Sequence, residues 1–140
     1  MKITIIATIA TLSLSLVACG AGAPTTPPAA VASSGAPTLD GAAYDVMLEF
    51  PGEAPVKDTL SFTSGRFESS ACTSLGFPKW TDYQSRTDGG KLAFDVTTRA
   101  PEGTSVEWHG TVHGDVIEGT ANRSMKGKTS AGTFRGNAHK

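Results

Sequence analysis

Apolar and polar residues alternate along several short stretches between residues 42 and 138. Around residues 44–50 every second side chain is large and apolar, and Asp45 and Glu49 lie between them. Around residues 104–113, Val106, Trp108 and Val112 are likewise separated by polar or charged side chains. A period of two is that of a β-strand with one buried face. It predicts eight strands, at about residues 42–50, 57–63, 66–72, 80–87, 91–99, 104–113, 115–124 and 131–138.

Short glycine-containing segments separate these strands. Ser64-Gly65, Asp88-Gly89-Gly90 and Gly114-Asp115 are typical of hairpin turns, because glycine readily adopts the positive φ that such turns need. Hairpins in series place neighbouring strands antiparallel, and a meander that closes on itself has no exposed edges. We therefore predict an all-β fold, an eight-stranded antiparallel up-and-down β-barrel, with a two-sheet sandwich as the alternative.

The N-terminus has a different pattern. Residues 3–17 are mostly apolar, and Lys2 is the only charged residue before Asp40. This run is shorter than the ~20 residues of a membrane-spanning helix and is typical of a secretory signal peptide. Its end, Leu16-Val17-Ala18-Cys19, resembles the lipobox of bacterial lipoproteins. The resemblance implies that residues 1–18 are a signal peptide, that cleavage occurs before Cys19, and that Cys19 receives acyl chains such as palmitate.

The residues after Cys19 predict how the protein is attached. Several acyl chains together hold a protein stably on a membrane, whereas a single chain does so only marginally. Gly20 in the next position resembles enteric lipoproteins of the outer membrane, so we expect a lipid-anchored protein of the bacterial cell envelope, exported to the periplasm and held in the outer membrane. Residues 19–39 are rich in Pro, Ala, Thr and Ser and lack charge, which predicts a flexible linker. The folded domain is then residues 40–140.

A resemblance to small, largely uncharacterised bacterial lipocalin-like barrels covers most of residues 39–140. It rests on the run from Gly110 to Thr120, on Phe134-Arg135-Gly136, and on Ser69-Ser70-Ala71-Cys72 followed by Gly76-Phe77. The resemblance implies a barrel that binds a small apolar or amphipathic ligand. Because its motifs are turn motifs, it argues for the fold more than for an activity.

Charge and composition narrow the possible functions. The chain has 12 Lys and Arg against 13 Asp and Glu, and residues 121–140 are basic with no acid. This basic end fits a solvated edge or an anionic lipid or glycan. No aromatic residues are interleaved with the basic ones as in nucleic-acid-binding proteins, so we expect no nucleic-acid partner.

Catalytic and metal-binding patterns are also lacking. No nucleophile elbow or phosphate-binding loop occurs, and we expect neither enzymatic activity nor a cofactor. His109 and His113 share an outward face with Glu107, but the two histidines are ~13 Å apart along a strand and cannot bind one ion alone. Cys72 is the one thiol left once Cys19 is lipidated. We interpret it as a buried small residue, with a reactive free thiol as the alternative.

The candidate ligand site lies in and around the barrel. The connection from Leu75 to Trp80 is the longest one with large aromatic residues, and Phe77 and Trp80 either cover a ligand mouth or plug the barrel. Eight strands leave an interior just wide enough for side chains or for one small ligand. A hollow interior would make the protein a ligand carrier, and a filled one would make it an interaction or inhibitor protein that acts through its loops. The candidate ligand-binding residues are Phe62, Phe77, Trp80, Phe94 and Trp108.

Overall fold

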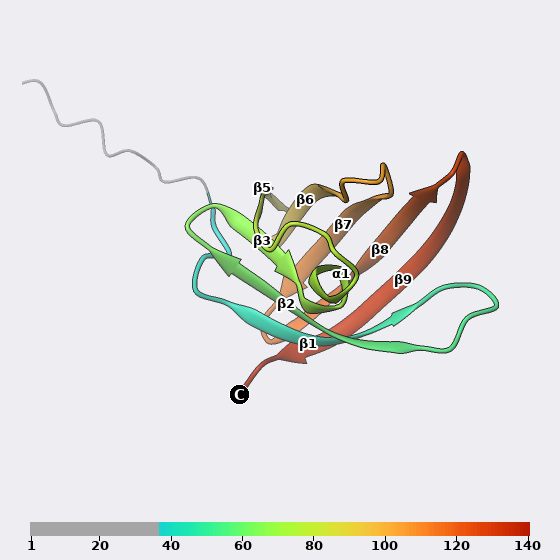
Figure 1. Ribbon diagram of the computed structural model, residues 1–140. Coiled ribbons are helices and arrows are strands. Elements are labelled where there is room, and N and C mark those ends of the chain that lie inside the picture. The colour runs from blue at the N-terminus through green and yellow to red at the C-terminus, as the bar shows by residue number, and fades with distance from the viewer. Residues whose placement is uncertain (1–36) are drawn as a thin grey trace, which may run out of the picture. The chain divides into compact units, whose positions relative to one another are not determined.

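The computed structural model describes residues 37–140 as one antiparallel β-sheet with a single short helix (Figure 1). Within this part of the chain no helix is long and apolar enough to cross a membrane. The elements are β1 (Ala43–Glu49), β2 (Val56–Thr63), β3 (Arg66–Ser69), α1 (Ser70–Ser74), β4 (Thr81–Asp82), β5 (Gln84–Asp88), β6 (Lys91–Arg99), β7 (Ser105–His113), β8 (Val116–Met125) and β9 (Lys128–Ala138).

The predicted features of the N-terminus fall mostly outside the described residues. The signal peptide at residues 1–18, the lipidation site Cys19 and the linker up to residue 36 lie there. The last residues assigned to the linker contact the barrel: Leu39 is buried in the core, and the carbonyl oxygen of Pro37 accepts a hydrogen bond from Ser85 Oγ.

The sheet forms a nearly closed up-and-down barrel. Its strand order is β4-β3-β2-β1-β9-β8-β7-β6-β5, so the first and last strands of the chain pair with each other. The two edge strands, β4 and β5, are consecutive in the chain and are joined by the single residue Tyr83. The predicted fold class is therefore confirmed, and the sheet is single rather than a two-sheet sandwich. Nine strands replace the predicted eight because the strand expected at 80–87 is interrupted at Tyr83.

Two strand boundaries differ from the prediction. The third strand, expected to reach residue 72, ends at Ser69 because α1 begins there. The Ser69 side chain caps this helix by accepting a hydrogen bond from the Cys72 N–H at 3.1 Å. The last strand begins at Lys128 rather than at residue 131, because a tight turn at Lys126 and Gly127 extends the β8–β9 hairpin. The remaining strand ends lie within one residue of the predicted ones.

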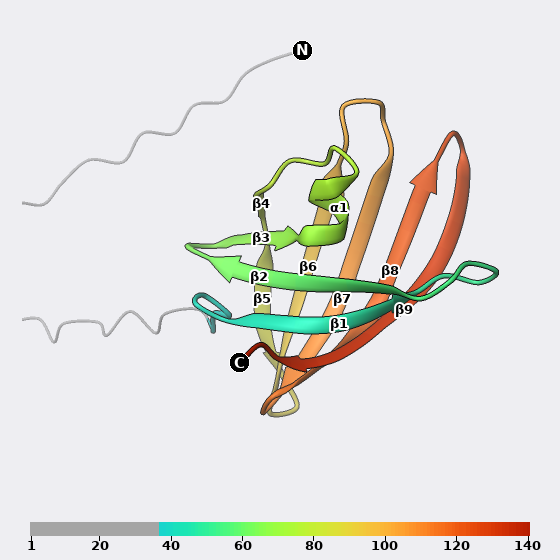
Figure 2. The same cartoon turned by 60° about the horizontal axis from the view of Figure 1, so that its bottom comes forward.

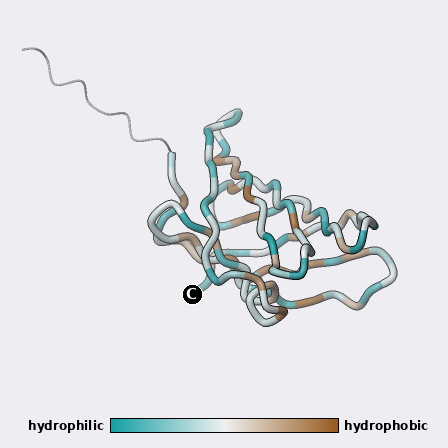
Figure 3. The backbone as a smooth tube through the Cα atoms, turned by 45° about the horizontal axis from the view of Figure 1, so that its top comes forward, coloured by the Kyte–Doolittle hydropathy of each residue, from teal (hydrophilic) through white to brown (hydrophobic). Residues whose placement is uncertain are grey.

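The predicted alternation places the core correctly. Tyr44, Val46 and Leu48 of β1 are buried, as are Val106, Trp108, Gly110 and Val112 of β7, while the residues between them are exposed or half-buried. The hydropathy-coloured trace shows the same switching of apolar and polar positions along the strands (Figure 3). All strands except the edge strands β4 and β5 therefore contribute buried residues to a common interior.

The two ends of the barrel differ. The β1–β2 loop, α1, the β6–β7 loop and the β8–β9 turn lie at one end, called here the open end (Figure 2). The β2–β3, β5–β6 and β7–β8 turns lie at the other, called here the filled end. The chain enters the barrel at the filled end, through residues 37–42.

Aromatic rings occupy the interior towards the filled end. The ring of Phe62 lies 5.1 Å from those of Tyr83 and Phe94 and 5.4 Å from that of Phe67, measured between centroids. Trp108 packs against Phe67 at 5.4 Å and closes the cluster. Offset and edge-to-face rings at such distances attract each other beyond the area that they bury.

Two glycines make room for these rings. Phe94, Gly110, Gly119 and Phe134 are cross-strand neighbours on β6, β7, β8 and β9. A Cβ atom at Gly110 would lie 2.6 Å from Cζ of Phe94 and 2.9 Å from Cζ of Phe134, and one at Gly119 would lie 2.6 Å from Cζ of Phe134. Both glycines lie inside strands, as predicted, and both are packed against the rings.

Tyr83 secures the point where the two edges of the sheet meet. Its hydroxyl accepts a hydrogen bond from the Leu39 N–H at 2.9 Å and lies 3.2 Å from Oδ1 of Asp40, to which it donates. Asp40 Oδ1 also accepts from the Gly65 N–H at 2.8 Å, and the Tyr83 N–H donates to the Gly65 carbonyl at 3.1 Å. These residues link the entering chain, the β2–β3 turn and the strand junction.

We expect Gly119→Ala to destabilise the barrel by about 1–3 kcal/mol, because the added methyl group must displace the Phe134 ring or the backbone of β7. Urea unfolding of the purified protein measures this free energy. Glu118→Ala, on the exposed face of the same strand, is the control and should change stability by less than about 0.5 kcal/mol. Equal stabilities for the two variants would contradict the close packing of ring on glycine.

The Tyr83 cluster also predicts a pH dependence. The Gly65 N–H above all, and the hydroxyls of Thr38 and Tyr83, lower the pKa of Asp40. A folded-state pKa below the unfolded value of ~3.9 gives a stabilising contribution that is complete above that value and is lost as the pH falls through the folded-state pKa. Wild type should therefore lose stability more steeply than Asp40→Asn below about pH 4. Urea unfolding at a series of pH values tests this, with Asp88→Asn in the exposed β5–β6 turn as the control.

Candidate functional site

An apolar cavity of about 270 Å³ lies at the open end of the barrel. This volume is near the lower limit of ~300–1,000 Å³ that is usual for small-molecule sites. Its walls come from β1, β2, α1, β7, β8 and the connections between them. The lining residues are Leu48, Phe50, Glu53, Val56, Ala71, Cys72, Leu75, Phe77, Glu102, Thr104, Val106, Trp108, Arg123 and Met125.

Trp108 forms part of the cavity wall nearest the aromatic cluster. Its side chain is fully buried, yet the indole Nε1 atom has no hydrogen-bond partner among the described residues. An unpaired buried donor costs about 1–3 kcal/mol, and buried polar groups in native proteins are usually paired. Trp108 therefore lines the cavity, and its buried N–H is left unpaired among residues 37–140.

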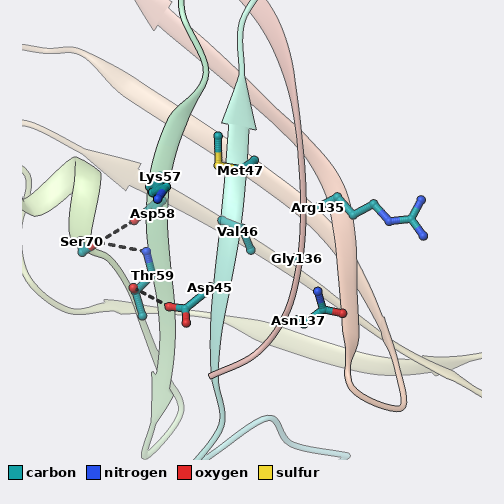
Figure 4. Close-up of a pocket in the computed structure, with 10 residues that line it drawn as sticks. All are labelled: Asp45, Val46, Met47, Lys57, Asp58, Thr59, Ser70, Arg135, Gly136 and Asn137. Atoms are coloured by element: carbon teal, nitrogen blue, oxygen red, sulfur yellow. Dashed lines mark hydrogen bonds between the residues drawn. The ribbon is translucent and has the colours of Figure 1, made fainter. Parts of the chain in front are cut away.

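Helix α1 forms the opposite wall and is held by a buried carboxylate. Asp58 of β2 accepts hydrogen bonds from Ser69 Oγ at 2.6 Å, Ser70 Oγ at 2.8 Å and the Ala71 N–H at 2.9 Å. Ser70 Oγ in turn accepts a hydrogen bond from the Thr59 N–H (Figure 4). This N–H lies just beyond the pairing of β2 with β3, which ends at Leu60 and Ser69. These contacts fix the first turn of α1 and so place Ala71, Cys72 and Leu75 at the cavity.

The rim of the cavity is apolar and exposed. Val56, Leu75 and Met125 have exposed fractions of 44%, 72% and 47%, and all three line the cavity. Large apolar side chains exposed together at a cavity mouth are typical of binding sites. We call these three residues the apolar rim.

An ion pair crosses one side of the mouth. Arg123 Nη1 donates to Glu53 Oε2 at 3.2 Å, and the guanidinium carbon lies 4.3 Å from the centroid of the Phe50 ring. Arg123 lowers the pKa of the Glu53 carboxyl below its ordinary value. Arg123 therefore combines stacking and pairing, which holds its long side chain over the edge of the cavity.

The structure separates the five predicted ligand-binding residues. Phe77 and Trp108 line the cavity. Phe62 and Phe94 lie deeper, in the aromatic cluster, where they fill the interior. Trp80 lies away from the cavity, with the Arg66 guanidinium and the Lys79 ammonium 5.9 and 5.7 Å from its ring.

Cys72 is a buried wall residue with an exposed fraction of 7%. Burial raises the pKa of its thiol, and the nearby Asp58 carboxylate acts in the same direction. Both effects disfavour the thiolate, which is the reactive form. This position accords with the interpretation of Cys72 as a small buried side chain.

The hollows on the outer face are less suited to a ligand. A shallow hollow of about 510 Å³ over β1, β2 and β9 is lined by side chains that point in different directions, such as Met47 and Arg135 (Figure 4).

His109 lies on the outer face as expected, with Nδ1 at 2.6 Å from Oδ1 of Asp95. Within residues 37–140, no three His, Cys, Asp or Glu side chains are grouped to hold a metal ion.

Comparison of the chain with protein-family models, with curated proteins and with solved structures gives no match. The site is therefore argued from its own residues and geometry.

The alternation along β2 also predicts that Asp58 is buried, although Asp58 was not among the predicted site residues. Residues 58, 60 and 62 alternate with polar positions, so Asp58 occupies an inward position next to Leu60 and Phe62. A carboxylate at an inward position needs several donors. The run Ser69-Ser70 supplies two of them, and the first backbone N–H groups of α1 supply the third.

Removal of the Asp58 carboxylate should loosen α1. We expect Asp58→Ala to cost about 1–3 kcal/mol, because it leaves the Ser69 hydroxyl and the Ala71 N–H without their partner. It should also speed alkylation of Cys72, measured by mass spectrometry of the labelled peptide. Asp82→Ala, at an exposed position of β4, is the control. Slow labelling of Cys72 in both variants would show that α1 does not depend on Asp58.

Proposed function

We propose that the protein binds a small apolar or amphipathic molecule in the cavity at the open end of its barrel, and that it does so as a lipid-anchored protein of the bacterial cell envelope. The observation that carries the proposal is the apolar cavity at the open end, which is lined by Trp108 and bordered by the apolar rim. A concave apolar site with a few polar groups is the usual form of a small-molecule site.

The packing of the barrel limits the size of the ligand. The aromatic cluster fills the interior beyond Trp108, so a ligand enters only the half of the barrel between Trp108 and α1. A compact ring or a short chain suits about 270 Å³ better than a large cofactor.

The apolar rim favours a second candidate function. Val56, Leu75 and Met125 present apolar surface to solvent, as residues at protein contacts often do. A partner protein could insert an apolar side chain into the same cavity. The two candidates share the site and differ in the occupant.

Trp108 itself can report on the occupant. The chain has two tryptophans, so Trp80→Phe leaves Trp108 as the one tryptophan emitter. In residues 20–140 of this variant, which contain the whole described barrel, titration with decanol should change the intensity and wavelength of the emission in a saturable way. The cause is the new contact between the bound probe and the indole ring.

A cavity-filling variant is the matched control for this titration. Ala71→Phe places a ring in the cavity from α1, and it should weaken decanol binding by about tenfold or more. Glu68→Ala, on β3 outside the cavity, should bind as the parent does. If neither decanol nor naphthalene changes the Trp108 emission while the fold is intact, the small-molecule proposal is wrong. The partner-protein function suggested by the apolar rim is then favoured.

A further inference from the structure

A second hollow adjoins the cavity at the open end. It measures about 440 Å³ and shares three lining residues with the cavity: Glu53, Arg123 and Met125. Its other walls are Lys126, Lys128, Thr129 and Ser130 of the β8–β9 turn and the start of β9. We call it the basic groove. The cavity and the basic groove therefore meet at the side chains that they share.

The charges of the two hollows differ. In the basic groove Arg123 is paired with Glu53, whereas Lys126 and Lys128 make no ion pair within residues 37–140. The groove thus has an excess of two positive charges, and Thr129 and Ser130 add hydroxyl donors. The one other charged residue of the cavity is Glu102, which does not line the groove.

The hairpin geometry holds the lysines beside the apolar rim. Lys126 and Gly127 have φ values of +50° and +75°, which is the pattern of a tight two-residue hairpin turn. Met125 and Lys128 are directly paired across this turn. Side chains of a directly opposed pair are neighbours in space. An apolar side chain of the cavity and a cationic side chain of the groove are thus adjacent.

We propose that the ligand is a short single-chain anionic amphiphile, whose apolar tail occupies the cavity and whose anionic head lies in the basic groove with Lys126 and Lys128. This inference rests on the proposed function and specifies the ligand of that same site. The head is a carboxylate or a phosphate, since both accept hydrogen bonds from ammonium and hydroxyl groups.

The test compares probes that share a tail and differ in the head. Trp108 emission is followed in the Trp80→Phe variant of residues 20–140, with decanoate, decyl phosphate, decanol and decyltrimethylammonium below their micellar concentrations. Both anions should bind roughly three- to tenfold more tightly than decanol, and the cation should bind most weakly. The advantage of the anions should shrink as salt is added. The tighter of the two anions identifies whether the head is a carboxylate or a phosphate.

A charge-matched pair of variants separates a local effect from the net charge of the protein. Lys126→Gln with Lys128→Gln should remove the advantage of the anions over decanol and leave decanol binding unchanged. Lys91→Gln with Lys140→Gln removes the same charge at the filled end of the barrel and should leave all affinities unchanged. All four lysines are exposed, so both double variants should keep the fold.

The outcomes distinguish this inference from the function on which it rests. If decanol and decanoate bind equally and the Lys126 and Lys128 variant changes neither, the head is not held in the basic groove and the inference is overturned, while the proposed function stands. A preference for the cation would also overturn it. If no probe binds to the folded protein, the proposed function itself fails.

Discussion

The packing of Phe94 and Phe134 over Gly110 and Gly119 determines which part of the barrel interior is filled by side chains. Without Cβ atoms at the two glycines, both rings fit against the backbone of β7 and β8 and contact the rings of Phe62, Phe67 and Trp108. Half of the interior becomes a solid core that stabilises the fold. The other half is not filled in this way and contains the cavity, so the packed core and the proposed binding site lie at different ends of one barrel.

The walls of that cavity depend on two polar arrangements that the core does not supply. The buried Asp58 carboxylate ties α1 to β2 and turns a short helix into a rigid wall. Arg123 stacks on Phe50 and pairs with Glu53, which holds the opposite side of the mouth. Both arrangements attach irregular parts of the chain to a strand, and an apolar site at a barrel mouth needs such attachments because loops alone are mobile.

The alternation of apolar residues predicts most of the strands to within one residue, because a strand with one buried face has a period that is visible in the sequence. Helix α1 has only five residues, too few to show a helical period, and Ser69 caps it where the pattern of β3 still continues. The interruption at Tyr83 follows from closing the sheet, which depends on strands far apart in sequence. The same holds for the site: Phe77 and Trp108 are both large and aromatic, like Trp80, and only the fold separates wall residues from the others.

The place where the chain enters the barrel has a mechanical consequence. A pulling force on the residues before Pro37 reaches the barrel first through the hydrogen bond from Ser85 to Pro37, and then through those that join Leu39 and Asp40 to Tyr83 and Gly65. These contacts lie at the filled end, beside the aromatic cluster, whereas the mouth is at the far end of the strands. The force is therefore applied to the end that holds the aromatic core, and the cavity lies at the opposite end of the strands.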